Sequence, residues 1–134
     1  MPNSYQPSDS ELDILRILWN SQPLSVRQVH EQLAKQKDVG YTTTLKQMQR
    51  MLEKGVLERR AEGRMHLYST SLQAPKVQRS MLGRLLDKAF GGSSFELVMQ
   101  ALGQSEPTEE ELDRLERFIQ EKKKQKRHDD DTDR

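Results

Sequence analysis

Residues 41–70 have the sequence YTTTLKQMQRMLEKGVLERRAEGRMHLYST, and this stretch decides the fold. Apolar residues recur in its first part at spacings of three and four, at Leu45, Met48, Met51 and Leu52. This periodicity predicts an amphipathic helix with one buried stripe. We expect Thr42 or Thr43 to cap the start of the helix, and Gly55 stands where a left-handed C-terminal cap is wanted.

Two strands are predicted directly after this helix, over residues 56–60 and 65–70. The turn between them falls around Ala61-Glu62-Gly63-Arg64, with arginines on both sides. The apolar side chains expected to face or cover the core are Leu57, Met65, Leu67 and Tyr68. A helix followed at once by a basic hairpin is typical of a winged helix-turn-helix.

The preceding residues supply the two helices that such a fold needs. Ser8 with Glu11, and Ser25 with Gln28, have the spacing of capping boxes, and each pair is followed by an apolar stripe. We therefore predict a mainly α fold with a small β-hairpin, in which residues 8–72 form a winged-helix DNA-binding domain. Residues 1–7 contain two prolines and no periodic pattern, so we expect a loose arm.

Three further helices are predicted over residues 74–120. Gly91-Gly92 ends the first, Ser93 or Ser94 begins the second, and Thr108 with Glu111 forms a third capping box. Because three short helices with one stripe each cannot enclose a core, we expect two copies to pack together as a homodimer. Residues 121–134 have no apolar side chains. They carry a block of positive charge followed by a block of negative charge, so we predict a disordered charged tail.

The composition limits the class of protein. The 134-residue chain has no cysteine, which excludes disulfides, thiol nucleophiles and cysteine metal sites. No apolar run reaches the roughly 20 residues of a membrane span, and the N-terminus lacks a signal-peptide pattern, so we expect a cytoplasmic protein. Residues 41–70 carry six Lys/Arg against three Glu, whereas residues 104–134 carry eight against eleven acidic residues. A basic middle suggests that this part meets a polyanion.

The polar side of the third helix suits a major groove, because threonine, glutamine and basic side chains can read base edges or reach phosphates. The DNA-binding candidates are Tyr41, Thr42, Thr43, Thr44, Lys46, Gln47, Arg50, Arg60 and Arg64, with Thr44 at the edge of the face. Tyr41 could instead cap the helix entry, and Arg59 stays undecided. An ordinary solvated helix face and a charged strand edge that prevents aggregation are the alternatives.

No catalytic, metal or cofactor site is predicted. The three histidines, His30, His66 and His128, share no ligand spacing, and no serine or threonine lies in a nucleophile-elbow or phosphate-loop context. We therefore expect a non-enzymatic protein without a cofactor.

Three stretches resemble the BlaI/MecI penicillinase-repressor family, which includes the copper-responsive CopY repressors. They are SELDILRILW at 10–19, the segment quoted above to Ser69, and LLDKAFGGSSFELV at 85–98. The resemblance covers residues 8–120 and implies a dimeric transcriptional repressor on operator DNA with dyad symmetry. It also implies that Thr43, Thr44, Lys46 and Gln47 read bases, while the wing holds the backbone.

The sequence departs from this family pattern at two places. CopY-type members carry a C-terminal cysteine cluster for copper, which this chain lacks. Penicillin-responsive members are released by cleavage at an Asn-Phe bond, where this chain has Ser94-Phe95. The inducer or sensor protein is therefore unknown. The alternative function is a winged-helix module that binds proteins and does not bind DNA.

Overall fold

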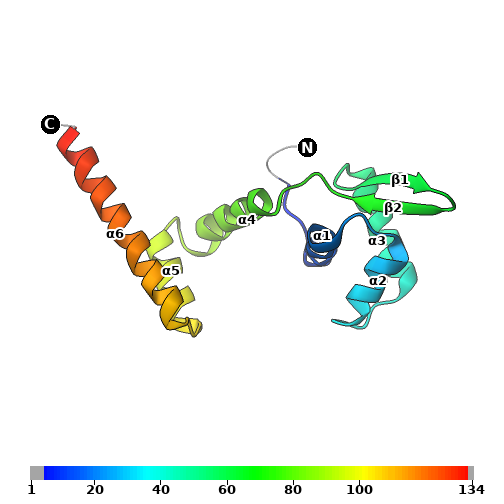
Figure 1. Ribbon diagram of the computed structural model, residues 1–134, viewed down its shortest axis with the longest axis horizontal. Coiled ribbons are helices and arrows are strands. Elements are labelled where there is room, and N and C mark those ends of the chain that lie inside the picture. Colours follow the sequence, from blue (N-terminus) through cyan, green and yellow to red (C-terminus); the bar gives the residue numbers. More distant parts are fainter. Residues whose placement is uncertain (1–4, 133–134) are drawn as a thin grey trace. The chain divides into compact units, whose positions relative to one another are not determined.

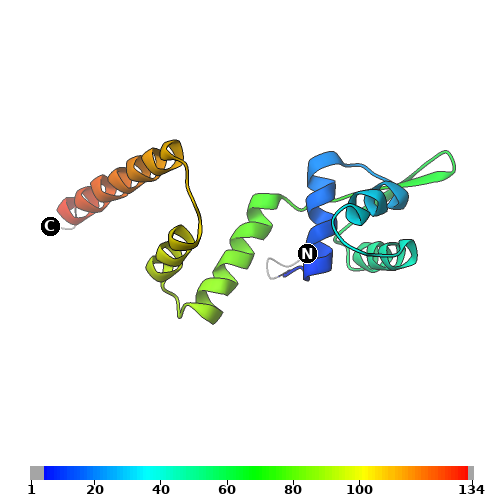
Figure 2. The ribbon, with the colours of Figure 1, turned by 90° about the horizontal axis from the view of Figure 1, so that it is seen from below.

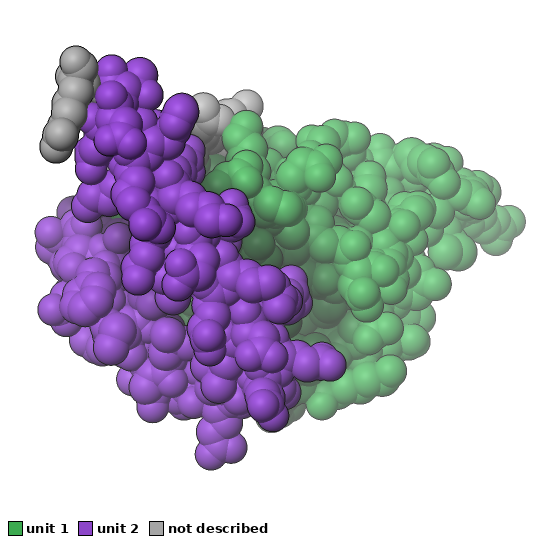
Figure 3. Space-filling model, turned by 60° about the vertical axis from the view of Figure 1, so that its left-hand side comes forward, with its two compact units in different colours: residues 1–85 green, residues 86–134 purple. Residues whose placement is uncertain are grey.

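The computed structural model describes residues 5–132. These residues divide into two compact units, with the division between Leu85 and Leu86 (Figure 3). The order of elements is three helices, a two-stranded antiparallel sheet and three further helices (Figure 1). This confirms the predicted mainly α fold with one hairpin. The first unit extends to Leu85, beyond the expected boundary near Leu72, so it includes most of the fourth helix.

Helices α1 (Asp9–Ser21) and α2 (Val26–Ala34) begin at the two predicted capping boxes. The hydroxyls of Ser8 and Ser25 accept hydrogen bonds from the backbone N–H groups of Glu11 and Gln28, whose side chains accept from the two serine N–H groups. These bonds satisfy backbone donors that a helix start leaves without partners. The capping residues therefore fix where both helices begin.

Helix α3 (Tyr41–Glu53) begins earlier than expected. Its N-cap is Gly40, with no side-chain capping bond, so the prediction that Thr42 or Thr43 caps the helix was wrong. Both threonines already lie in the first turn, because extended backbone ends at Gly40 (φ −82°, ψ 155°). At the other end Gly55 adopts φ +78°, the left-handed conformation predicted for it.

The hairpin consists of β1 (Glu58–Glu62) and β2 (Met65–Ser69), in a register that pairs Arg59 with Tyr68 and Arg60 with Leu67. The first strand therefore begins two residues later than predicted, because Val56 and Leu57 are buried ahead of it. Met65 is 50% exposed, so the prediction that it covers the core was wrong. It pairs with Glu62 beside the turn and lines a groove with residues of α2 and α3.

The core of the first unit lies between α1, α2, α3 and the base of the hairpin. The buried apolar residues there are Ile14, Leu15, Ile17, Leu18, Val26, Val29, Leu33, Met48, Met51, Val56, Leu57 and Tyr68. Tyr68 also exchanges backbone hydrogen bonds with Leu24, which joins the hairpin to the segment before α2. Both Leu45 and Leu52 are only partly buried at the margin of this core.

The segments before α1 and after β2 contact the rest of the first unit. The indole N–H of Trp19 donates to the carbonyl of Leu72 at 2.8 Å. Tyr5 packs against the core, and the Gln6 amide donates to the Ser80 hydroxyl. The expected loose arm is therefore packed at Tyr5 and Gln6, whereas its residues 1–4 lie outside the described residues.

Helix α4 (Ala74–Ala89) is followed by α5 (Ser94–Gln104) and α6 (Glu109–Thr132). Gly91 and Gly92 both have positive φ, and Ser93 caps α5. The predicted disordered tail was wrong for residues 121–132, which continue α6 as one unbroken helix (Figure 2). Lys, Arg, Gln and Glu favour helix without needing burial. The last two residues, 133–134, lie outside the described residues.

Within residues 5–132, no helix combines the length and apolar character needed to cross a membrane.

Candidate nucleic-acid interface

One side of α3 is open along its whole length. Its centre is formed by Thr42, Lys46 and Gln49, which follow one another at spacings of four and three and are all exposed. Thr43 and Arg50 are exposed beside them. Five polar side chains therefore stand on a continuous outer face, opposite the buried Met48 and Met51 that hold the helix on the core.

Two residues predicted for this face lie elsewhere. The Thr44 side chain is 1% exposed, with its hydroxyl 3.4 Å from the Gly40 carbonyl and 3.4 Å from Nδ1 of His30. Thr44 is therefore buried, and the prediction that it lies at the edge of the outer face was wrong. Gln47 is half-buried toward the other side of the helix from Gln49.

Tyr41 joins the start of α3 to α2. The Arg27 guanidinium carbon lies 5.4 Å from the centre of the Tyr41 ring, and the His30 ring meets it edge to face at 5.7 Å. A cation over a ring face is attracted by the ring's electrons, which orients both side chains. Tyr41 remains 39% exposed, so these contacts leave part of the residue open to solvent.

A groove of about 640 Å³ runs between α2, α3 and the hairpin. It is lined by Arg27, Tyr41, Gln49, Arg59, His66 and Tyr68, among others. The groove brings together residues from three elements, so the outer face of α3 and one face of the hairpin form one surface.

The pairing register decides which hairpin arginine shares that surface. Arg59 lies opposite the buried Tyr68, and cross-strand partners point to the same face of a sheet. Arg60 therefore points to the other face, where its guanidinium forms an ion pair with Glu62 at 3.3 Å. Arg64 is exposed at the turn. The undecided Arg59, and not Arg60, faces the groove.

The surface carries uncompensated positive charge. In the part of the chain that the structure describes, no ion pair engages Arg27, Lys46, Arg50, Arg59 or Arg64. Unpaired cations spread over adjacent elements attract a polyanion without the cost of breaking existing pairs. No group of three His, Asp or Glu side chains within residues 5–132 could hold a metal ion.

Sequence analysis missed two residues of this surface. Gln49 was overlooked because the outer face was centred on Lys46 and Gln47; the spacing Thr42–Lys46–Gln49 would have identified it. Arg27 belongs to α2, and no pattern along the chain predicts its contact with Tyr41.

A three-helix core with an open polar third helix and an adjoining basic hairpin defines a winged helix-turn-helix protein. The chain belongs to the penicillinase repressor family, whose model matches residues 7–121.

The chain is similar to curated relatives, to some over most of its length and to others over about half of it. It is 23% identical over 122 residues to the penicillinase repressor of Bacillus licheniformis, covering 91% of this chain and 95% of that protein. It is 36% identical over 62 residues to the transcriptional regulator BlaI of Mycobacterium tuberculosis (strain CDC 1551 / Oshkosh), covering 46% and 45%. The solution structure of the DNA-binding domain of the repressor BlaI aligns with a TM-score of 0.50 and 25% identity, covering 57% of this chain and 93% of that one.

Proposed function

We propose that this chain is a transcriptional repressor that binds a dyad-symmetric DNA operator as a homodimer. The observation that carries the proposal is the joint surface of α3 and the hairpin, where polar side chains face outward among unpaired cations. Its relatives are named as repressors and transcriptional regulators, and the similar solved domain is titled as DNA-binding.

In the proposed complex, α3 enters the major groove with its outer face. Lys46 and Gln49 are the side chains best placed to reach base edges, because they stand at the centre of that face with Thr42. Lysine pairs with guanine and glutamine with adenine, while a threonine methyl can touch thymine. Thr43 and Arg50 stand at the flank, within reach of the neighbouring backbone.

The hairpin is proposed to contact the DNA backbone beside that groove. Arg59 extends from the face shared with α3, and Arg64 stands at the tip. Such contacts fix the position of the protein on DNA without reading sequence. The ion pair with Glu62 gives Arg60 a smaller share in this binding.

The second unit supports the homodimer. None of the residues of α5 and α6 is buried, although both helices carry large apolar side chains. Phe95, Val98, Met99, Leu112, Phe118 and Ile119 are all exposed. Exposed apolar area of this extent marks an interaction surface. Two joined copies would present two α3 helices to successive major grooves, which requires an operator with dyad symmetry.

Repression would be released by any signal that separates the two copies, because each half-site alone is bound weakly. An inducer or sensor protein is therefore a further proposed partner.

A salt titration tests DNA binding. Full-length protein is titrated into a fluorescent mixed-sequence duplex at rising salt, beside the triple variant Lys46→Gln/Arg50→Gln/Arg59→Gln. We expect affinity to fall steeply with salt for the wild type, with a shallower slope for the variant, because fewer counterions are released. Equal slopes, or no binding at low salt, would favour the protein-docking alternative.

A further inference from the structure

We propose that Tyr5 and Gln6 are positioning residues, which fix the direction of α4 on the first unit and thereby set the half-site spacing that the homodimer accepts. This inference rests on the proposed function and adds what determines the geometry of the operator. Three observations carry it: the helical connection between the two units, the contact of Gln6 with α4, and the contact of Tyr5 with the residues that anchor α3.

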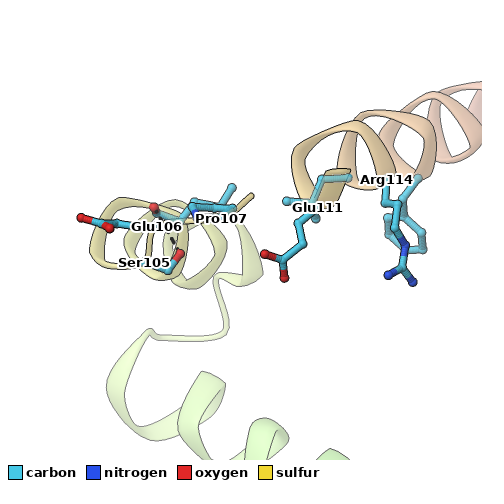
Figure 4. Close-up of a pocket in the computed structure, with 8 residues that line it drawn as sticks. Ser105, Glu106, Pro107, Glu111 and Arg114 are labelled. Atoms are coloured by element: carbon cyan, nitrogen blue, oxygen red, sulfur yellow. Dashed lines mark hydrogen bonds between the residues drawn. The ribbon is translucent and has the colours of Figure 1, made fainter. Parts of the chain in front are cut away.

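The connection between the two units is a helix. The division between Leu85 and Leu86 falls inside α4 (Ala74–Ala89). A helical connection is stiff, whereas a flexible loop would leave its direction undefined. The second unit follows directly, and in it α5, α6 and the loop between them line a pocket of about 490 Å³ (Figure 4). The direction in which α4 leaves the first unit is therefore one determinant of where the second unit lies.

The segment before α1 holds α4 beyond its first turn. The Trp19 indole bonds to the Leu72 carbonyl just before α4, and Val77 is buried within the helix. The Gln6 amide donates to the hydroxyl of Ser80, which lies about 9 Å along the helix axis from the start of α4. A helix attached only at its start can pivot, and an attachment further along removes that freedom.

This segment is itself restrained. Tyr5, Gln6 and Pro7 are half-buried, although they lie outside any helix or strand. Proline has a fixed φ and limits the residue before it to extended backbone, so Gln6 has few conformations to choose from. The capping box at Ser8 fixes the next residues at the start of α1. The Gln6 contact therefore restrains α4 more than a contact from a flexible arm would.

The same segment reaches the residues that anchor α3. Tyr5 packs against the core, and its hydroxyl oxygen is buried. Burial raises the pKa of the Tyr5 hydroxyl, and the nearby Glu11 carboxylate raises it further. Glu11 forms an ion pair at 2.9 Å with Lys54, the C-cap residue of α3. The segment before α1 therefore links α4 to the end of the helix that is proposed to read DNA.

This link matters because two α3 helices must reach two half-sites at once. A stiff connection gives a high effective concentration at one spacing and very little at others, whereas a flexible one lowers that maximum and spreads it. Loosening the segment should therefore weaken binding at the preferred spacing and widen the range of spacings accepted. Each α3 should still bind a single half-site as before.

A panel of operators with altered spacing tests the inference. Full-length wild type, Gln6→Ala and Tyr5→Ala/Gln6→Ala are titrated against the operator that the wild type selects. They are also titrated against copies with roughly two or roughly five base pairs added between the half-sites. We expect the wild type to lose about tenfold to hundredfold in affinity on the longer spacers and the double variant less than about threefold, with Gln6→Ala between them.

The matched control is Gln78→Ala, which removes an exposed amide of the same kind from α4. It should keep the wild-type ratio of affinities between spacings. A duplex with one half-site separates positioning from general stability, because every variant should bind it within about twofold of the wild type.

Three outcomes would be decisive. Equal spacing ratios in the wild type and the double variant would overturn this inference and leave the proposed function intact. A loss on the single half-site as large as on the full operator would also overturn it, because the segment would then only stabilise the fold. If circular dichroism shows that the double variant is unfolded, the spacing ratio of Gln6→Ala decides, since Tyr5 keeps its packing there. A wild type that selects no operator would overturn the proposed function itself.

Discussion

The carboxylate of Glu11 lies 2.9 Å from the ammonium group of Lys54, so the N-terminus of α1 is joined to the C-terminus of α3. Glu11 is 3% exposed and also closes the capping box with Ser8. Lys54 is the C-cap residue of α3, and its side chain remains half exposed. This contact holds α3, the helix that carries the proposed DNA-binding face, at a fixed place on the core.

Neutralising Glu11 should destabilise the protein. We expect Glu11→Gln to lower the free energy of unfolding by about 1–2 kcal/mol, because the amide fills the same space without the charge-assisted bonds. Urea unfolding at neutral pH measures this. Asp13→Asn is the matched control, since the Asp13–Lys37 pair is about 36–40% exposed at both side chains and should contribute less than about 0.5 kcal/mol. Equal losses of unfolding free energy in the two variants would contradict the claim that the buried charge of Glu11 stabilises the fold.

The same contact should make the protein sensitive to acid. Burial raises the pKa of Glu11, but hydrogen bonds from the Ser8 backbone and from Lys54 outweigh it, and the pKa is lowered below its ordinary value of 4.5. The stabilisation is therefore complete above pH 4.5 and is lost as pH falls through the folded-state pKa. The difference in unfolding free energy between wild type and Glu11→Gln should shrink below pH 4.5. A difference that stays constant down to acid unfolding would show that the charge of Glu11 is not involved.

The two neighbouring arginines of β1 should differ in DNA binding. We expect Arg59→Ala to weaken binding to any duplex and to reduce the salt slope by about one per protomer, as one phosphate contact is lost. Arg60→Ala should change affinity less than about twofold, because its partner is Glu62. Fluorescence anisotropy at several salt concentrations measures both. The reverse order of effects would mean that the hairpin meets DNA with its other face.

The two glutamines of α3 should differ in specificity. Gln49→Ala is expected to cost about 1–3 kcal/mol on the preferred sequence and much less on random duplex, as expected for a side chain that reads a base. Gln47→Ala should affect both duplexes equally, because Gln47 is half-buried on the other side. Competition binding with the two duplexes gives the ratio of the affinity for the preferred sequence to the affinity for random duplex. A loss of specificity in Gln47→Ala alone would show that Gln47, as predicted from the sequence, reads a base and that Gln49 does not.

Sequence alone predicted the features that depend on local chemistry. The capping boxes at Ser8 and Ser25 gave the starts of two helices, and Gly55 ended the third with the expected positive φ. These signals work because a capping side chain and a left-handed glycine act on backbone groups within a few residues.

Features that depend on tertiary contacts were not predicted. A shift of one residue moves every strand side chain to the other face, so the choice between Arg59 and Arg60 needed the pairing with Tyr68. Thr44 looked like a surface residue, but it is buried near His30, which is on another helix. The end of α6 was missed because charged composition alone does not distinguish a solvated helix from a disordered tail.

The central claim is that α3 and the hairpin of a homodimer read an operator. Selection of bound sequences from a random duplex pool, with full-length protein at physiological salt, tests it most directly. We predict enrichment of an inverted repeat whose half-sites are separated by about one helical turn of DNA or a multiple of it. A pool that stays random after repeated rounds, while the protein remains folded, would contradict the claim.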